Sequence, residues 1–210
     1  MNVCILMGSP RKNGNTAALL SPFCKELDRL GCNHETIRLY EKRIASCTAC
    51  RACQRDWSGF NCRIQDDAKD LAHRILNCDL LVLATPIYSW FCTPPMKALL
   101  DRLVYGMNKY YGDTKGPALW KGKKVALITT CGYPLEKGAD LWETGMRRFC
   151  KHSQLSYIGM LAEHDEGYDT VFMNKEKEQH SIEFAQKIYQ ELESLKKDGL
   201  DTKRVAHGWL

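Results

Sequence analysis

Two short runs of residues, Leu80–Ala84 and Val125–Ile128, are entirely apolar, and they constrain the fold more than any other feature of the sequence. A strand with one face in water alternates apolar and polar residues, whereas an unbroken apolar run indicates a strand buried on both faces. Such strands occur in parallel sheets that are covered by helices on both sides. The two runs therefore predict an α/β fold built on a parallel sheet.

The other apolar patterns agree with this fold. Further strands are expected at about 3–7, 34–40 and 155–162. Apolar residues recur at helical spacing at about 16–30, 68–76, 96–103, 138–151 and 175–196. Five strands that alternate with helices predict a doubly wound sheet, and ligands of such sheets bind beyond the carboxyl ends of the strands.

Local signals set the expected boundaries. Pro22 either kinks the first helix or marks a restart of it with Ser21 as the N-cap, and Gly31 ends the helix. A chain of 210 residues is most simply one domain. We expect a single domain over residues 1–197, a cysteine-rich insert at about 44–64 and a polar tail over residues 198–210.

Charge and cysteine content exclude several classes of protein. The formal charge of +5 comes from interspersed residues, so neither nucleic-acid nor membrane binding is expected. The first residues lack the basic start of a secretion signal, and no apolar run approaches the length of a membrane span. Eleven cysteines in such a chain are typical of reduced thiols or metal ligands, and we expect a cytoplasmic protein.

The loop Gly8–Thr16 joins a predicted strand to a predicted helix, where backbone N–H groups at the positive end of the helix attract anions. Ser9, Asn15 and Thr16 add side-chain donors, and Arg11 adds a fixed charge. The loop lacks both the lysine of a Walker A motif and the three glycines of a Rossmann fingerprint. It suits a single phosphomonoester such as that of FMN; the alternative is an ordinary strand-to-helix turn.

Two more loops are expected at the same edge of the sheet. Residues 85–92 include Tyr88, Trp90 and Phe91, whose rings could form a platform for a flat ligand. Alternatively, these rings pack against helices or a partner subunit. The loop Thr129–Leu135 begins with small residues, through which the backbone could approach the edge of a ring.

From Met1 to about Ala162 the chain resembles the NADPH-dependent FMN reductases, which are flavodoxin-like proteins. The motifs that carry the resemblance are Gly8-Ser9-Pro10-Arg11 with Gly14-Asn15-Thr16, Cys47-x2-Cys50-x2-Cys53, Asp66-Asp67, Thr85-Pro86-Ile87-Tyr88, and Lys97 with Asp101-Arg102. Their order and spacing make the match specific. The resemblance implies the strand order 2-1-3-4-5, FMN as cofactor and NAD(P)H as co-substrate.

The resemblance also implies a cofactor site. The residues expected to bind FMN are Ser9, Arg11, Asn13, Gly14, Asn15 and Thr16 around the phosphate, with Pro86, Ile87, Tyr88, Ser89, Trp90, Thr130, Cys131 and Gly132 around the ring. No catalytic side chain is expected, because the flavin carries the chemistry and the six histidines are scattered.

Four cysteines form a possible metal site. The three-residue spacing of Cys47, Cys50 and Cys53 would place their sulfurs on one side of one or two helical turns, and Cys62 could return to the same point. The cluster most resembles that of the iron–sulfur flavoproteins, which hold a [4Fe–4S] group, although eight residues separate Cys53 from Cys62. Structural zinc and free thiols are the alternatives.

Three functions follow from these features. The first is an FMN-dependent oxidoreductase that passes electrons from NAD(P)H to a quinone, a flavin, a nitro or azo compound, or a similar acceptor. The second is an iron–sulfur flavoprotein that carries electrons from a ferredoxin-like donor through a cluster and FMN. The third is a non-catalytic module with structural zinc. The aromatic loop and the segment Tyr105–Tyr111 also predict a homodimer or homotetramer, because both should expose apolar surface.

Overall fold

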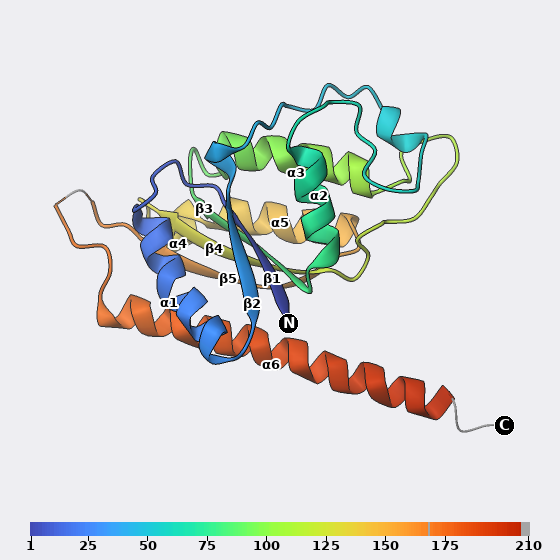
Figure 1. Ribbon diagram of the computed structural model, residues 1–210. Coiled ribbons are helices and arrows are strands. Elements are labelled where there is room, and N and C mark those ends of the chain that lie inside the picture. Colours follow the sequence, from blue (N-terminus) through green and yellow to red (C-terminus); the bar gives the residue numbers. More distant parts are fainter. Residues whose placement is uncertain (168, 207–210) are drawn as a thin grey trace.

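The protein is described here by a computed structural model that covers residues 1–167 and 169–206. A five-stranded parallel sheet in the order β2-β1-β3-β4-β5 forms its centre (Figure 1). The strands are β1 (Asn2–Met7), β2 (Asn33–Arg38), β3 (Leu80–Pro86), β4 (Lys124–Cys131) and β5 (Ser156–His164). The predicted fold class and strand order are thus confirmed.

Helices cover both faces of the sheet (Figure 1). One layer consists of α1 (Asn15–Arg29) and α6 (Lys175–Ala206), and the other of α2 (Ala68–Asn77), α3 (Pro94–Met107) and α5 (Asp140–His152). Three short elements complete the fold: the 3-10 helices η1 (Leu39–Glu41) and η2 (Ala52–Gln54), and the one-turn helix α4 (Leu135–Gly138).

The unbroken apolar runs are buried on both faces, as expected. In β3, Leu81 and Leu83 pack in the core under α2, α3 and α5, whereas Leu80 and Val82 pack in the core under α1 and α6. Successive side chains of a strand point to opposite faces, so each central strand must be apolar at every position. The parallel sheet follows directly from this requirement.

The structure decides two predicted helix boundaries. Of the two alternatives for Pro22, the restart at Ser21 is wrong, because helix α1 passes through Pro22. The neighbouring Phe23 and Leu27 are fully buried, and we attribute the continuity to this packing, which offsets the hydrogen bond that proline cannot make. Helix α6 continues beyond residue 196 to Ala206, because the glycine at 199 weakens a helix without ending it as proline does. Residues 207–210 of the expected tail lie outside the described residues.

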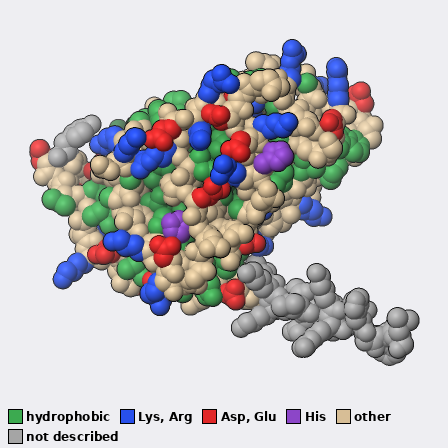
Figure 2. Space-filling view, viewed as in Figure 1, with side chains coloured by type: hydrophobic (Ala, Val, Ile, Leu, Met, Phe, Trp, Pro, Cys, Tyr) green, Lys and Arg blue, Asp and Glu red, His purple; other side chains and the backbone are tan. Residues whose placement is uncertain are grey.

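Charged residues of both signs intermingle on the face that Figure 2 shows, as the sequence indicates. None of the helices in the described ranges combines the length and the apolar character that a membrane span requires. Helix α6, the longest, carries charged residues throughout its described turns.

Glu26 joins the two helices of one layer. Its carboxylate, nearly buried, accepts two hydrogen bonds from Arg29 of α1 and one from Gln186 of α6, each 2.7 Å long. The bonds from Arg29 and then Gln186 stabilise the charged form and lower the pKa of Glu26 to about 2, against an ordinary value of 4.5.

The lowered pKa predicts a loss of stability in acid. The carboxylate of Glu26 stabilises the fold above pH 4.5, and this contribution disappears as the pH falls towards 2. Glu26→Gln should remove that part of the pH dependence, so that the free energies of unfolding of the variant and the wild type converge in acid. Urea unfolding at about pH 6 and about pH 3 measures this. An equal difference between the two proteins at both values would contradict it.

Candidate functional site

The expected cofactor residues gather at the carboxyl edge of the sheet. Ser9, Arg11, Asn13, Gly14, Asn15 and Thr16 lie in the β1–α1 loop and the first turn of α1; Pro86 ends β3 and is followed by Ile87, Tyr88, Ser89 and Trp90; Thr130 and Cys131 end β4, and Gly132 follows. Since β1, β3 and β4 are adjacent, the three loops are neighbours in space.

Hydrogen bonds tie these loops together. The hydroxyl of Thr16 lies 2.8 Å from that of Thr130, which joins the first turn of α1 to the end of β4. The Ile87 N–H donates to the Thr130 carbonyl over 2.8 Å. The buried Thr93, which precedes α3, donates its hydroxyl to the Gly8 carbonyl over 2.7 Å. The edge is therefore one connected unit.

The start of α1 fits a phosphate. In the described part of the chain, no side chain caps this helix and its first turn holds no acidic residue. A Cβ atom on Gly14 would lie 2.9 Å from Cβ and 3.2 Å from Nε of Arg11, so the Arg11 side chain passes directly over the helix start. Free N–H groups beside a guanidinium are the features that bind a phosphomonoester.

An aromatic hairpin follows β3. Tyr88 and Phe91 exchange two backbone hydrogen bonds of 2.8 and 3.0 Å, which leaves Ser89 and Trp90 at the turn. Both have positive φ, 49° and 66°, the conformation that a two-residue hairpin of type I′ requires. A residue other than glycine with positive φ costs about 1–2 kcal/mol of conformational free energy. Backbone strain of this kind concentrates at functional sites.

The hairpin presents aromatic surface to solvent. Tyr88, Trp90 and Phe91 are 45–51% exposed, so they are not core residues of the monomer. The ring of Trp90 stacks on that of Tyr133, with centroids 6.0 Å apart, and its Nε1 donates to the Lys137 carbonyl over 3.0 Å.

A cavity of about 240 Å³ opens between this hairpin and the loop after β4. It is lined by Ile87, Ser89, Trp90, Cys131, Gly132, Tyr133 and Gly138. A Cβ atom on Gly132 would meet nothing within 4 Å, so the backbone there is open to a ligand. Burial raises the pKa of the Cys131 thiol, which donates to the Tyr133 carbonyl over 3.2 Å.

The cysteine-rich insert forms a second cavity, of about 230 Å³. Its lining includes Cys47, Cys50, Cys53 and Cys62, together with Arg102, Tyr105 and Tyr111. Among the described residues, no three histidine, cysteine or acidic side chains are arranged to hold a metal ion. The four thiols thus surround a space instead of converging on a point.

The expected helical turns for these thiols are wrong. Residues 43–50 form no helix, and a single 3-10 turn begins at Ala52. Ala49 and Arg51 have positive φ, 52° and 55°, which breaks any helical repeat between the cysteines.

The expectation that Tyr105–Tyr111 exposes apolar surface holds for Tyr105, which is 38% exposed, but not for the middle of the segment. Met107, Asn108 and Lys109 are fully buried under the insert. Gln54 donates to the carbonyls of Tyr105 and Asn108 over 2.5 and 2.9 Å, and Lys109 Nζ donates to the Cys53 carbonyl over 2.7 Å. These partners are more than 50 residues apart in the sequence, so no local sequence pattern indicates that the insert buries this segment.

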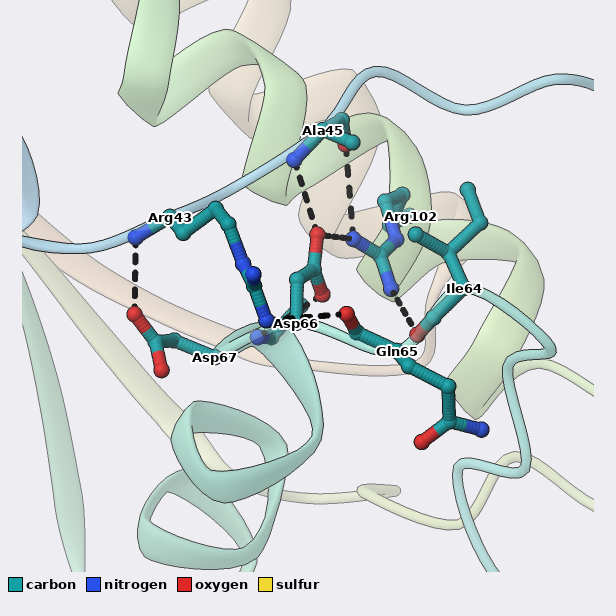
Figure 3. A network of polar contacts seen from close by, with 8 residues as sticks. Arg43, Ala45, Ile64, Gln65, Asp66, Asp67 and Arg102 are labelled. Atoms are coloured by element: carbon teal, nitrogen blue, oxygen red, sulfur yellow. Dashed lines mark hydrogen bonds and ion pairs between the residues drawn. The ribbon is translucent and has the colours of Figure 1, made fainter.

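A buried ion pair closes the base of the insert (Figure 3). Arg102 of α3 donates to Asp66 over 2.5 Å, and both side chains are at most 2% exposed. Burial raises the pKa of Asp66, but hydrogen bonds from Arg102 and the N–H groups of Ala45 and Ala68 outweigh it, and the pKa is lowered. The sequence signals both residues as motif members without indicating that they pair.

Phe60 anchors the insert against α3 at Gly106. A Cβ atom at position 106 would overlap the Phe60 ring, so Gly106→Ala should lower the free energy of unfolding by about 1–3 kcal/mol. Gly145→Ala in α5 is the matched control: nothing lies within 4 Å of its Cβ position, and the helix should gain about 0.5–1 kcal/mol. Thermal unfolding of both variants measures the contrast, and equal shifts would refute it.

Comparison with known proteins agrees with this geometry. Residues 1–139 match the NADPH-dependent FMN reductase family. The chain belongs to that family. It is 34% identical over 102 residues to an iron–sulfur flavoprotein of Archaeoglobus fulgidus, a match that covers 48% of this chain and 45% of that protein. An iron–sulfur flavoprotein of Methanosarcina thermophila is 29% identical over 112 residues, or 53% and 56% of the two chains.

The sequence matches cover part of each protein, and the structural match concerns the fold. The chain spans about half the length of the curated relatives that it matches. Its fold is similar to that of an NAD(P)H:quinone oxidoreductase from Methanothermobacter marburgensis, with a TM-score of 0.65 over 92% of this chain and 97% of the other. At 18% identity this likeness concerns the fold alone.

Proposed function

We propose that this chain is an FMN-dependent oxidoreductase that passes electrons from NAD(P)H to a small acceptor such as a quinone, a flavin, or a nitro or azo compound. Membership of the FMN reductase family supports this activity. The observation that carries it is the hydroxyl contact of Thr16 with Thr130 at the carboxyl edge of the sheet. This contact links the start of α1, which suits a phosphate, to the end of β4, beside which the aromatic cavity opens.

The residues at this edge fit FMN by their chemistry. The phosphate would lie at the start of α1, held by backbone N–H groups and the Arg11 guanidinium. The flat ring would lie between the Tyr88–Phe91 hairpin and the backbone at Gly132, where aromatic surface excludes water. FMN supplies hydride and electron transfer when bound, and the protein orients the ring and tunes its electronics. Backbone donors of both loops would stabilise charge on the ring.

Absorption spectroscopy and steady-state kinetics test this proposal. We expect purified chain to bind one FMN and to oxidise NADPH or NADH when a quinone, an azo dye or free flavin is supplied. Trp90→Ala should weaken the activity, and Trp57→Ala, which changes an exposed tryptophan of the insert, is the control. Absence of FMN binding, or of any NAD(P)H oxidation by the FMN-loaded chain, would overturn the proposal.

We propose a [4Fe–4S] group in the cysteine cavity as a second candidate, which would make the chain an iron–sulfur flavoprotein fed by a ferredoxin-like donor. The observation in its favour is that Cys47, Cys50, Cys53 and Cys62 line a single cavity. Four thiolates are the ligand set of a [4Fe–4S] group, whereas a zinc site would need a second, separate Cys-x2-Cys pair in place of the overlapping third cysteine found here.

Anaerobic reconstitution with iron and sulfide tests this second candidate. We expect about four irons per chain and a broad absorption shoulder beside the flavin bands. Cys53→Ser should lose the iron, and Cys24→Ser, which changes a thiol of α1, should keep it. Failure to bind iron under conditions in which FMN binds would leave the first function alone.

The exposed aromatic residues also support assembly. Tyr88, Trp90, Phe91 and Tyr133 are between 45% and 60% exposed at one edge, more apolar surface than an isolated chain usually leaves in water. We propose that they lie in the interface of a homodimer or homotetramer. Light scattering at micromolar concentration measures this, and a particle of 24 kDa would contradict it.

A further inference from the structure

The surroundings of the cysteine cavity carry more positive than negative charge: Arg51 and Arg102 line it, and Lys109 contacts the backbone of the lining residue Cys53. Arg102 and Lys109 are fully buried, and Asp66 is the carboxylate that pairs with Arg102. Within the described ranges, Lys109 forms no ion pair, and its ammonium donates to the Cys53 carbonyl. Buried charges are stable only when they are paired, so surroundings of this kind favour a negative group in the cavity.

Arg102 also has one buried N–H donor, at Nε, that the hydrogen bonds of its other nitrogens leave unused. Its Nη1 donates to Asp66 and, over 3.3 Å, to the Ala45 carbonyl, and its Nη2 donates to the Ile64 carbonyl over 3.4 Å. Its Nε is buried and has no hydrogen-bond partner within the described ranges. Buried donors are almost always paired, and an exception often marks the place of an absent group.

The place of Arg102 indicates what that partner is. The side chain lines the cavity together with the four cysteines. Sulfur ligated to metal carries negative charge and accepts hydrogen bonds.

We propose that Arg102 is a positioning residue for the sulfur-ligated group in this cavity, with its free Nε–H donating to a cysteine sulfur and its charge offsetting that of the thiolates. The inference rests on the second proposed function, that Cys47, Cys50, Cys53 and Cys62 hold a [4Fe–4S] group. Hydrogen bonds to sulfur and nearby positive charge favour the more negative, reduced state. Arg102 therefore raises the reduction potential of the group.

The test compares wild type, Arg102→Lys and Arg102→Gln, reconstituted anaerobically with iron and sulfide. Arg102→Lys keeps a charge that can pair with Asp66 but lacks the Nε donor, whereas Arg102→Gln loses the charge as well. Lys97→Gln, which removes an exposed cation of the same helix, is the matched control. FMN content reports whether each variant folds, and iron content and a redox titration followed by electron paramagnetic resonance report on the group.

We expect the wild type and Lys97→Gln to share one midpoint potential. Arg102→Lys should make one-electron reduction at least tenfold less favourable, a shift of about 59 mV, and Arg102→Gln should have a larger effect or lose the iron. If the wild type binds iron and Arg102→Lys keeps its potential, the inference is wrong while the iron–sulfur function stands. If the wild type binds FMN but no iron, that function fails and the inference falls with it. An equal shift in Lys97→Gln also overturns the assignment.

Discussion

Asp66→Ala should lower the free energy of unfolding by about 3–5 kcal/mol, the largest loss that we expect from a single substitution in this chain. The change leaves the Arg102 cation buried without its carboxylate. It also removes the acceptor of the Ala45 and Ala68 N–H groups, which hold the insert against the start of α2. Urea unfolding followed by circular dichroism measures the loss.

Asp101→Ala is the matched control for this prediction. Asp101 pairs with Lys97 one helical turn away over 2.7 Å, a contact nearly as short as that of Asp66 with Arg102, but both side chains are about half exposed. Exposed pairs of this type contribute about 0.3–0.5 kcal/mol, because water solvates the charges almost as well. Similar losses of unfolding free energy in the two alanine variants would show that the Asp66–Arg102 pair stabilises the fold no more than an exposed ion pair does.

Joint replacement of Asn15 and Thr16 by alanine should lower FMN affinity at least tenfold while the fold survives. Each side chain can donate to a phosphate at the start of α1, and a hydrogen bond to a charged group contributes about 1.5–3 kcal/mol. Fluorescence titration of the FMN-free chain with FMN measures the affinity, because bound flavin changes its emission.

Single variants separate two effects in this prediction. Thr16 also contacts Thr130 across the edge, so its loss loosens the joined loops, whereas Asn15→Ala removes a donor alone. Asn33→Ala with Thr36→Ala changes the same residue types in β2 and should leave the affinity unaltered. Unchanged affinity in the Asn15 and Thr16 double variant would show that the phosphate binds elsewhere.

The sheet and its ligand edge could be predicted because their signals are local. Leu80–Ala84 is apolar at every position since both faces of β3 are covered, and this is visible without any knowledge of partners. Gly8–Thr16 likewise carries its turn and its helix start within nine residues of sequence. The order of strands followed from the resemblance, whose motifs fix which loops meet.

The cysteine insert could not be predicted in the same way, because distant residues determine its shape. Three-residue spacing of cysteines is also compatible with a loop, and the positive φ of Ala49 and Arg51 has no sequence signal such as glycine. The burial of Lys109 depends on Gln54 and the Cys53 carbonyl, which reach it from another part of the chain. Thr93 is similar: Thr-Pro-Pro indicates the start of α3, but not the hydroxyl contact with Gly8.

Helix α3 acts as a rigid spacer between the Gly8 loop and the cysteine cavity. Thr93, at its start, contacts the Gly8 loop, and Arg102, nine residues later, lines the cysteine cavity. Nine residues of α-helix span roughly 13 Å along the axis. This helix, and not the sequence or length of the insert, therefore sets the separation of the Gly8 loop from the cysteine cavity. A one-residue deletion within α3 would rotate Arg102 by about 100° relative to Thr93 and turn its side chain away from the cysteine cavity.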